Sequence, residues 1–399
     1  MSNIKNLEHE YIAPTYARFD VAFVRGEGAT LWDDEGKAYI DMGSGIAVSV
    51  LGYGNKAWAQ AVCGQANKLA HVSNLYYTQP QGELAKILCE RTGMKKVFFA
   101  NSGAEANECA IKAARKYAAD KHGENVKPVI ITLNDSFHGR TLATLAATGQ
   151  DYFHHYFGPF PEGFVHVPPN DTEALKKALD ENPACAVMLE VVQGEGGVEP
   201  LDAAYVKAAR ALTEERDVLL IIDEVQTGNG RLGTLFGYQQ LGIMPDLVTT
   251  AKGIAGGLPM GACLLGAKVE HTLSAGSHAT TFGGNPVCAA AGVAVMNQLT
   301  DELLHDVKKK GEYIKAELSA CPSVSRVSGY GLMLGVSTDK DAKALVQALL
   351  KKGVVTLTAK QKLRLLPPLT ISWEQLKQAV SIIKDALQAS PASSETQAN

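Results

Sequence analysis

The sequence predicts an α/β protein that is built around a large, mostly parallel β-sheet. Two observations predict this class: short apolar runs alternate with helical patterns between about residues 45 and 285, and helical segments at 104–119 and 202–215 separate neighbouring runs. Such alternation is typical of strands that are joined by crossover helices. The predicted strands are residues 96–100, 129–132, 186–189, 218–222, 247–250 and 262–266.

The C-terminal part of the chain has a different pattern and predicts a small α+β unit. Its helices are expected at 285–299, 301–318 and 373–389, and its strands at 324–327, 331–336, 354–357 and 363–366. A hairpin-like segment at 30–39 suggests that the N-terminus joins this unit. We therefore expect an N-terminal segment (1–45) that joins the small domain, a large domain (46–285) and a small domain (286–389). The polar residues 390–399 are expected to form a disordered tail.

Composition excludes several classes of protein. The 399 residues, 46% of them hydrophobic, are enough for a large core and for more than one domain. The net charge of −4 and the lack of a long basic run give no case for a nucleic-acid partner. Seven scattered cysteines without a C-x-x-C pair indicate neither a disulfide framework nor a zinc site, and no metal is expected. Without a signal-peptide core or a membrane-length apolar stretch, we expect a cytoplasmic protein with no membrane association.

Two residues at predicted strand ends carry the strongest chemical signal. Lys252 follows the run at 247–250 and enters a glycine-rich turn. Desolvation there lowers the pKa of an ammonium group and favours a Schiff-base nucleophile. Asp223 ends the run at 218–222, where a carboxylate rarely becomes buried without a partner. An acid and a lysine at the ends of successive strands suggest pyridoxal phosphate, with the acid on the pyridine nitrogen and the lysine on the aldehyde.

A candidate anion site lies between the predicted strand at 96–100 and the helix that follows it. Ser102, Gly103 and Ala104 place free backbone N–H groups at the start of that helix, where an anion binds well. Gly103 allows close approach of a ligand to the backbone. Taken alone, the segment favours an ordinary helix N-cap, since Ser and Asn are preferred at that position anyway.

Other candidate residues are weaker when each is taken alone. Phe137 could stack on a planar cofactor and Arg140 could bind a carboxylate, although a core ring and a solvated arginine would look the same. Glu190 ends a strand at the sheet edge where α/β proteins bind ligands, or it is a buried acid with a local partner. The loop at 278–286 could bind a phosphate or form a plain turn. Arg364 is either an outward-facing strand residue, which the pattern alone favours, or a buried anion receptor.

The histidines His154 and His155 lie in an aromatic stretch at 151–164. They lack the i, i+4 spacing of a helical metal pair, so we interpret this stretch as packing and surface.

Taken together, seven segments in this order resemble the class-III, fold-type-I pyridoxal phosphate aminotransferases. They are Phe98-Phe-Ala-Asn-Ser-Gly-Ala-Glu-Ala-Asn107, Phe137-His-Gly-Arg-Thr141, Glu190 with Gln193-Gly-Glu-Gly-Gly-Val198, Asp223-Glu-Val-Gln-Thr-Gly228, Thr250-Ala-Lys252, Thr280-Thr-Phe-Gly-Gly-Asn-Pro286 and Arg364-Leu-Leu-Pro-Pro-Leu369. The resemblance covers nearly the whole chain. It implies a seven-stranded, mostly parallel sheet domain beside a smaller α+β domain, pyridoxal phosphate as cofactor, and a homodimer.

The resemblance also implies a role for individual residues. The implied catalytic residues are Lys252, which binds the cofactor and moves the proton, and Asp223, which keeps the ring nitrogen protonated. The implied cofactor-binding residues are Ser102, Gly103, Ala104, Phe137, Asp223, Glu224, Val225, Gln226, Lys252 and Thr281, the last reaching the phosphate across the subunit interface. The implied substrate-binding residues are Arg140, Glu190, Thr280 and Arg364. Arg140 with Thr280 would receive the donor's α-carboxylate, and Glu190 would form a switchable pair with Arg364.

Within this family, the sequence most resembles the ornithine aminotransferase subgroup. This resemblance implies transfer of the 5-amino group of acetylornithine to 2-oxoglutarate, giving glutamate, in arginine biosynthesis. Ornithine, succinylornithine and 4-aminobutyrate are alternative donors. An aminomutase of the same fold, which would need no 2-oxoglutarate, and a non-catalytic binding protein, which would not need intact Lys252 and Asp223, are alternatives of other kinds. Two departures from the family, Glu190-Val191 in place of Glu-Pro and the unusual loop at 49–55, bear on the identity of the substrate.

Overall fold

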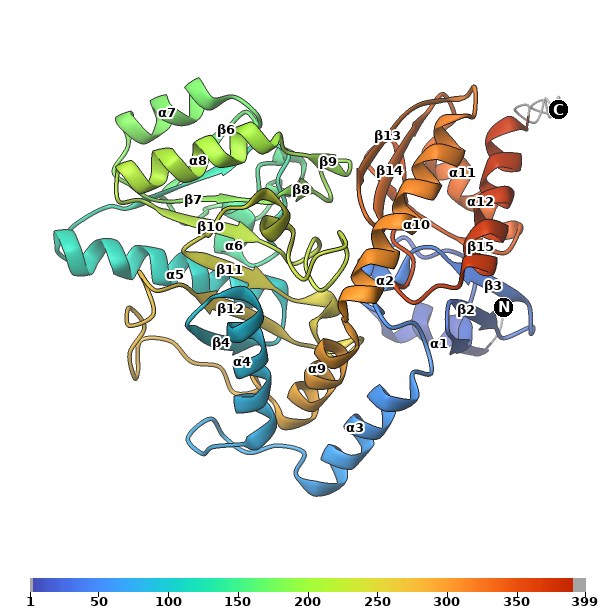
Figure 1. Ribbon diagram of the computed structural model, residues 1–399, viewed down its shortest axis with the longest axis horizontal. Helices are drawn as coiled ribbons and strands as arrows, with labels where there is room; N and C mark the ends of the chain where they lie inside the picture. The colour runs from blue at the N-terminus through green and yellow to red at the C-terminus, as the bar shows by residue number, and fades with distance from the viewer. Residues whose placement is uncertain (1–2, 390–399) are drawn as a thin grey trace.

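The computed structural model describes residues 3–389, so the expected disordered tail at 390–399 lies outside the described residues. Figure 1 shows two parts: a large sheet with its helices on the left, and the C-terminal helices and strands on the right, beside the N-terminal strands. No helix among residues 3–389 is long and apolar enough to cross a membrane.

The large part is a seven-stranded sheet with the order β4-β12-β11-β10-β7-β5-β6. Its strands are β4 (Lys96–Ala100), β5 (Val129–Leu133), β6 (Phe164–Val167), β7 (Ala184–Leu189), β10 (Leu219–Asp223), β11 (Leu247–Thr250) and β12 (Gly261–Leu265). Only β12 runs antiparallel to its neighbours. The α/β class and the mostly parallel sheet are therefore confirmed. The strand missing from the prediction is β6, whose short apolar run is interrupted by His166.

Helices cover both faces of this sheet. Ala186 and Ile221 pack on one face with residues of α5 (Gly103–His122). Val187 and Leu220 point to the other face, where α7 (Thr172–Glu181) and α8 (Ala203–Glu215) lie. Burial on both faces explains why these strands are continuous apolar runs rather than alternating patterns. Further helices around the sheet are α3 (Lys56–Lys68), α4 (Gln79–Thr92), α6 (Leu142–Ala147) and α9 (Pro286–Gln298).

The smaller part contains an antiparallel sheet with the order β13-β14-β17-β16. Its strands are β13 (Val324–Tyr330), β14 (Met333–Thr338), β16 (Leu357–Ala359) and β17 (Lys362–Leu365), and its helices are α10 (Asp301–Ser319), α11 (Ala342–Lys351) and α12 (Trp373–Gln388). These helices pack on the strands and on one another. The predicted C-terminal helices at 301–318 and 373–389 are confirmed.

The N-terminal strands are tied to the C-terminal part by one short strand. They are β1 (Phe23–Glu27), β2 (Thr30–Asp33) and β3 (Ala38–Asp41), and β15 (Val354–Val355) pairs with β3 in parallel. The single strand expected at 354–357 is thus divided: β15 joins this sheet, whereas β16 pairs with β17. The domain boundaries stay a prediction, and α9, which follows the boundary proposed after residue 285, packs against α3 and α4.

The remaining elements are short, and several of them border the cavity described below. They are α1 (Asn3–Tyr11), α2 (Ser44–Ala47), η1 (Asp151–Phe153), β8 (Val192–Gln193), β9 (Glu199–Pro200), η2 (Gly237–Leu241) and η3 (Lys252–Ala255). Because β4, β5, β7, β10 and β11 run in the same direction, their carboxyl ends meet at one edge of the sheet. Ligands of open α/β sheets bind at that edge.

Candidate active site

A cavity of about 410 Å³ opens at the carboxyl edge of the large sheet. Most of the predicted site residues line it: Ser102, Gly103, Ala104, Phe137, Arg140, Glu190, Asp223, Val225, Gln226 and Lys252. These residues come from five segments of the chain that are far apart in sequence. The parallel strands bring them together, because each residue lies at or shortly after the carboxyl end of a strand.

Lys252 enters the cavity from a strained turn after β11. Its φ of 46° lies in the left-handed region, which costs a residue with a side chain about 1–3 kcal/mol. Asn229 holds the turn, since its Nδ2 donates to the carbonyl oxygen of Ala251 and to Thr250 Oγ1, both at 2.9 Å. Burial lowers the pKa of Lys252 below its ordinary value, and the nearby guanidinium of Arg364 lowers it further. A lower pKa increases the fraction of this amine that is unprotonated at a given pH.

Asp223 is buried and is held by three donors. Its Oδ2 accepts from Asn107 Nδ2 at 2.8 Å and lies 2.8 Å from His138 Nδ1, and its Oδ1 accepts from the backbone N–H of Val225 at 2.9 Å. His138 donates to Asp223 when its proton is on Nδ1. The Asp223 carboxylate is only 2% exposed, so these donors replace the water that burial removed.

Sequence reasoning assigned no role to His138 or Asn107. Both contact Asp223 across large distances in sequence, Asn107 from α5 and His138 from the loop after β5. Their contact depends on the order of the strands, so no local pattern could have identified it.

The start of α5 is both a capped helix end and a wall of the cavity. Ser102 Oγ accepts from the backbone N–H of Glu105 at 3.1 Å, which is the N-cap interaction. A Cβ atom at position 103 would lie 2.7 Å from Val225 Cγ1, so only glycine fits there. Capping and anion binding are therefore compatible, because the cap uses the N–H of Glu105, whereas Gly103 and Ala104 line the cavity.

The structure corrects the placement of Glu224, which does not line the cavity. Neighbouring residues of an extended chain point to opposite sides, so Glu224 turns away from the site when Asp223 enters it. Its Oε1 accepts from the backbone N–H of Tyr238 at 2.8 Å, and its Oε2 accepts from Thr227 Oγ1 at 2.5 Å. Burial raises the pKa of Glu224 to about 7.

The predicted pair of Glu190 and Arg364 is wrong. Arg364 Nη1 lies 2.5 Å from Glu195 Oε1 and 3.2 Å from Gln226 Oε1. Glu190 instead accepts from the backbone N–H groups of Phe137 at 3.0 Å and Gly194 at 3.2 Å. Both of its oxygens are therefore used by the loops of the large part, whereas Glu195 lies on the turn between β8 and β9 that faces β17.

The two carboxyl groups also differ in their electrostatics. Burial raises the pKa of Glu190 to about 7. Burial also acts to raise the pKa of Glu195, but the adjacent Arg364 guanidinium outweighs it and holds that pKa below its ordinary value.

Thr280 and Thr281 lie beside the cavity rather than in it. Thr280 Oγ1 accepts from Asn101 Nδ2 at 3.1 Å, and Asn101 itself lines the cavity. The side chain of Thr281 is exposed. Within one chain neither threonine reaches the other site residues, so their implied roles stay predictions.

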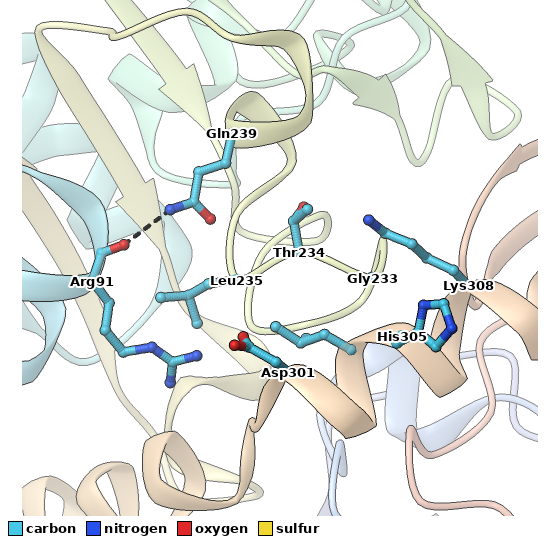
Figure 2. Close-up of a pocket in the computed structure, with 9 residues that line it drawn as sticks. Arg91, Gly233, Thr234, Leu235, Gln239, Asp301, His305 and Lys308 are labelled. Carbon is cyan, nitrogen blue, oxygen red and sulfur yellow. Dashed lines mark hydrogen bonds between the residues drawn. The ribbon is translucent and has the colours of Figure 1, made fainter.

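A second cavity, of about 390 Å³, contains none of the predicted site residues (Figure 2). Arg91, Asp301, His305 and Lys308 border it, together with the loop at 233–235. Arg91 is already engaged, because its guanidinium donates to the carbonyl oxygens of Met296 and Leu299. Within residues 3–389, no cluster of side chains could hold a metal ion. The cavity at the sheet edge is therefore the candidate active site.

Comparisons with known proteins point in the same direction. The Aminotransferase class-III family matches residues 11–387. The acetylornithine aminotransferase of Haemophilus ducreyi is 52% identical over 96% of this chain and 98% of its own length. A crystal structure of N-acetylornithine aminotransferase from Stenotrophomonas maltophilia covers 96% of this chain and 97% of its own, with a TM-score of 0.83 and 35% identity. An ornithine aminotransferase from Toxoplasma gondii, with PLP in partial occupancy at its active site, has a TM-score of 0.91 and 30% identity over 96% of this chain and 93% of its own.

The buried carboxyl group of Glu224 should make the free energy of unfolding depend on pH. Its pKa is raised from 4.5 to about 7 on folding. The protonated group therefore contributes to the free energy of unfolding fully below about pH 4.5, and this contribution is lost as the pH rises through 7. That rise corresponds to about 3 kcal/mol. Glu224→Gln should remove this part of the decline in unfolding free energy between pH 5 and 8. The amide can still accept from Tyr238 and donate to Thr227.

Denaturant unfolding at fixed protein concentration measures this effect. Glu90→Gln is the matched control, since Glu90 is exposed on α4 and forms only a long i,i+4 pair with Lys86. If Glu224→Gln and the wild type lose the same stability over this pH range, Glu224 is ionised in the fold at pH 5.

Proposed function

This chain belongs to the class-III aminotransferases, and we propose that it transfers the 5-amino group of N2-acetylornithine to 2-oxoglutarate. The observation that carries the chemistry is the meeting of Lys252 and Asp223 in one cavity at the sheet edge. The donor is supported by curated relatives named acetylornithine aminotransferase, which match nearly the full chain. We further propose that this reaction serves arginine biosynthesis.

The enzyme depends on pyridoxal phosphate, and the residues of the cavity fit that cofactor. The first turn of α5, with Gly103 and Ala104, would hold the phosphate, and Asp223 would face the ring nitrogen. Phe137 and Val225 would cover the ring, and Gln226 would contact its phenolic oxygen. When bound, the cofactor supplies an electron sink for the negative charge that develops on the reacting carbon.

Lys252 would provide the acid–base chemistry. Its lowered pKa suits an amine that must accept a proton from the donor carbon bearing the reacting amino group and later return it. Positioned acid–base groups of this kind contribute about 10²–10⁴-fold in rate. Asn229 anchors the backbone of the turn that carries Lys252.

Two arginines would receive the substrates' carboxylates. Arg140 lines the cavity and forms no ion pair within residues 3–389, so it is available for the carboxylate farthest from the reacting carbon. Arg364 is covered by Glu195 at 2.5 Å. Glu195 would neutralise Arg364 while acetylornithine reacts through its terminal amine. It would release Arg364 when the carboxylate next to the keto group of 2-oxoglutarate enters.

We also propose a homodimer with the active site at its interface. Leu75, Tyr76, Tyr77 and Phe282 are exposed. Asn74 Nδ2 donates to the carbonyl oxygen of Gly283 at 2.8 Å, so these exposed side chains belong to two adjoining loops. An apolar surface next to an active site is typical of an interface. Thr281 lies on the second loop and would reach the partner subunit's cofactor phosphate.

We propose that the enzyme resides in the cytoplasm. All seven cysteines are free thiols, which suits a reducing compartment.

A donor panel tests the proposed reaction. Acetylornithine, ornithine, succinylornithine and 4-aminobutyrate would each be combined with 2-oxoglutarate, and glutamate formation measured. The proposal predicts the highest kcat/KM for acetylornithine. A higher value for another donor would replace the proposed substrate, and amine migration without 2-oxoglutarate would indicate an aminomutase.

Lys252→Ala should abolish turnover and remove the visible absorption that arises when the cofactor is covalently held. Lys177→Ala, an exposed change on α7, should preserve both. The absorption spectrum of the reconstituted protein and the turnover number are the measurements. Wild-type turnover in Lys252→Ala would contradict the assigned role.

Glu195→Gln should favour the glutamate half-reaction over the acetylornithine half-reaction. A neutral amide would hold Arg364 less tightly, and we expect the ratio of the two single-turnover rates to change about tenfold, equivalent to about 1.4 kcal/mol. Glu199→Gln is the matched control, because Glu199 begins β9 just after this turn but pairs with Lys362 and Arg326. Equal effects of Glu195→Gln on both half-reactions would reject the switch.

Co-expression of two defective subunits tests the shared site. In a heterodimer of Lys252→Ala and Thr281→Ala subunits, one site contains both substitutions and the other contains none. Activity should therefore exceed that of either variant alone. Sedimentation should show a dimer, and an active monomer at assay concentration would contradict the proposal.

A further inference from the structure

The guanidinium group of Arg140 lies against two aromatic rings. Its Cζ is 4.1 Å from the ring centroid of Phe153 and 5.4 Å from that of Phe137. The two rings meet edge to face, with centroids 5.6 Å apart and planes at 74°. A cation over an aromatic face is attracted by the negative charge of that face. Arg140 is thus held by rings although no carboxylate of residues 3–389 pairs with it.

The two rings belong to different parts of the chain. Phe137 lines the cavity, and its backbone N–H donates to Glu190. Phe153 ends η1, is half-buried and does not line the cavity. It belongs to the aromatic stretch that the sequence suggested was packing and surface. Phe153 therefore approaches Arg140 from outside the cofactor site.

The segment that carries Phe153 is fastened on both sides. Gln150, just before η1, donates from Nε2 to the carbonyl oxygen of Ser136 at 3.0 Å. His154, just after η1, places Nε2 at 2.8 Å from the carbonyl oxygen of Leu145. Tyr152 adds an edge contact to Phe153, with centroids 5.4 Å apart. These contacts give the ring a fixed position relative to the loop that carries Phe137 and Arg140.

An aromatic ring differs from an acid in how it holds an arginine. A carboxylate partner would occupy the N–H donors of Arg140 and compete with the substrate, whereas a ring covers one face and leaves the N–H edges open. A carboxylate binds an arginine through those edges, in the plane of the guanidinium. A free arginine side chain samples many rotamers, so a fixed one loses less entropy when it binds.

We propose that Phe153 is a positioning residue that holds the Arg140 guanidinium in the orientation that receives the donor's carboxylate. This inference rests on the proposed function, in which Arg140 binds that carboxylate. Phe153 thereby favours amino donors that carry a carboxylate far from the reacting amine over donors that lack one.

Two donors that differ only in this carboxylate provide the test. One is acetylornithine, and the other is the mono-acetylated 1,4-diamine, which has the same chain and the same reacting amine. Phe153→Ala should raise KM for acetylornithine about three- to tenfold, as expected for loss of one cation–π contact, with little change in kcat. Phe153→Tyr should restore the wild-type KM, because it keeps the ring. Phe153→Leu should behave like Phe153→Ala, because it keeps only apolar volume.

The carboxylate-free donor separates positioning from structural damage. Its kcat/KM should be the same in the wild type and in all three Phe153 variants, because it does not use Arg140. Tyr156→Ala, a change at a 98% exposed ring in the same segment, should leave both donors unaffected. Equal losses for both donors, or an unchanged KM for acetylornithine in Phe153→Ala, would overturn the inference.

Arg140→Ala distinguishes this inference from its premise. If Arg140→Ala leaves KM for acetylornithine unchanged, the premise that Arg140 binds the carboxylate fails, and the inference fails with it. If Arg140→Ala raises that KM but Phe153→Ala does not, only the positioning role fails. If both single variants raise KM for acetylornithine, the double variant decides. A KM in the double variant no higher than that of Arg140→Ala shows that Phe153 acts through Arg140. Additive increases in the double variant would contradict the positioning role.

Discussion

A buried carboxylate at the carboxyl end of β10 is the constraint on which the rest of the site depends. Asp223 is removed from water, and leaving such a charge without partners would cost several kcal/mol. Asn107 of α5, His138 of the loop after β5 and the backbone N–H of Val225 satisfy it. The start of α5 and the loop after β5 also supply Gly103, Ala104 and Phe137 to the wall of the cavity, where we propose that they hold the cofactor. Satisfying one charge therefore ties α5 and the loop after β5 to the end of β10.

A second set of charges joins the smaller part of the molecule to this edge. Three basic side chains of the β16–β17 hairpin meet three acids of the large part: Lys360 with Asp135, Lys362 with Glu199, and Arg364 with Glu195. Lys362 and Arg364 are two residues apart on β17 and so share one face. The pairs of Lys360 and Lys362 are partly exposed and contribute little individually, but together they fix the strand from which Arg364 extends. In the proposed switch, the pair of Arg364 and Glu195 would open while these two pairs hold the hairpin in place.

The sequence was sufficient wherever a local pattern determined the structure. Lys252, Asp223 and the start of α5 follow buried strands, and parallel strands bring such residues together at one edge. The sequence was insufficient where contacts depend on strand order or on small differences within a turn. His138 contacts Asp223 and Phe153 contacts Arg140, and only the fold brings these residues together. Glu190 directly follows β7, Glu195 lies in the glycine-rich turn after β8, and only the structure shows that Glu195 is the one that meets Arg364 of β17.

We propose that the Asp223 carboxylate keeps the ring nitrogen of the bound cofactor protonated. The most direct test is the nitrogen chemical shift of pyridoxal phosphate labelled with ¹⁵N in the ring, measured in the wild type and in Asp223→Asn. The amide cannot stabilise a proton on that nitrogen as a carboxylate does. We expect a protonated ring nitrogen in the wild type across the neutral pH range and an unprotonated one in the variant. An unprotonated ring nitrogen in the wild type, or the same shift in both proteins, would contradict the account.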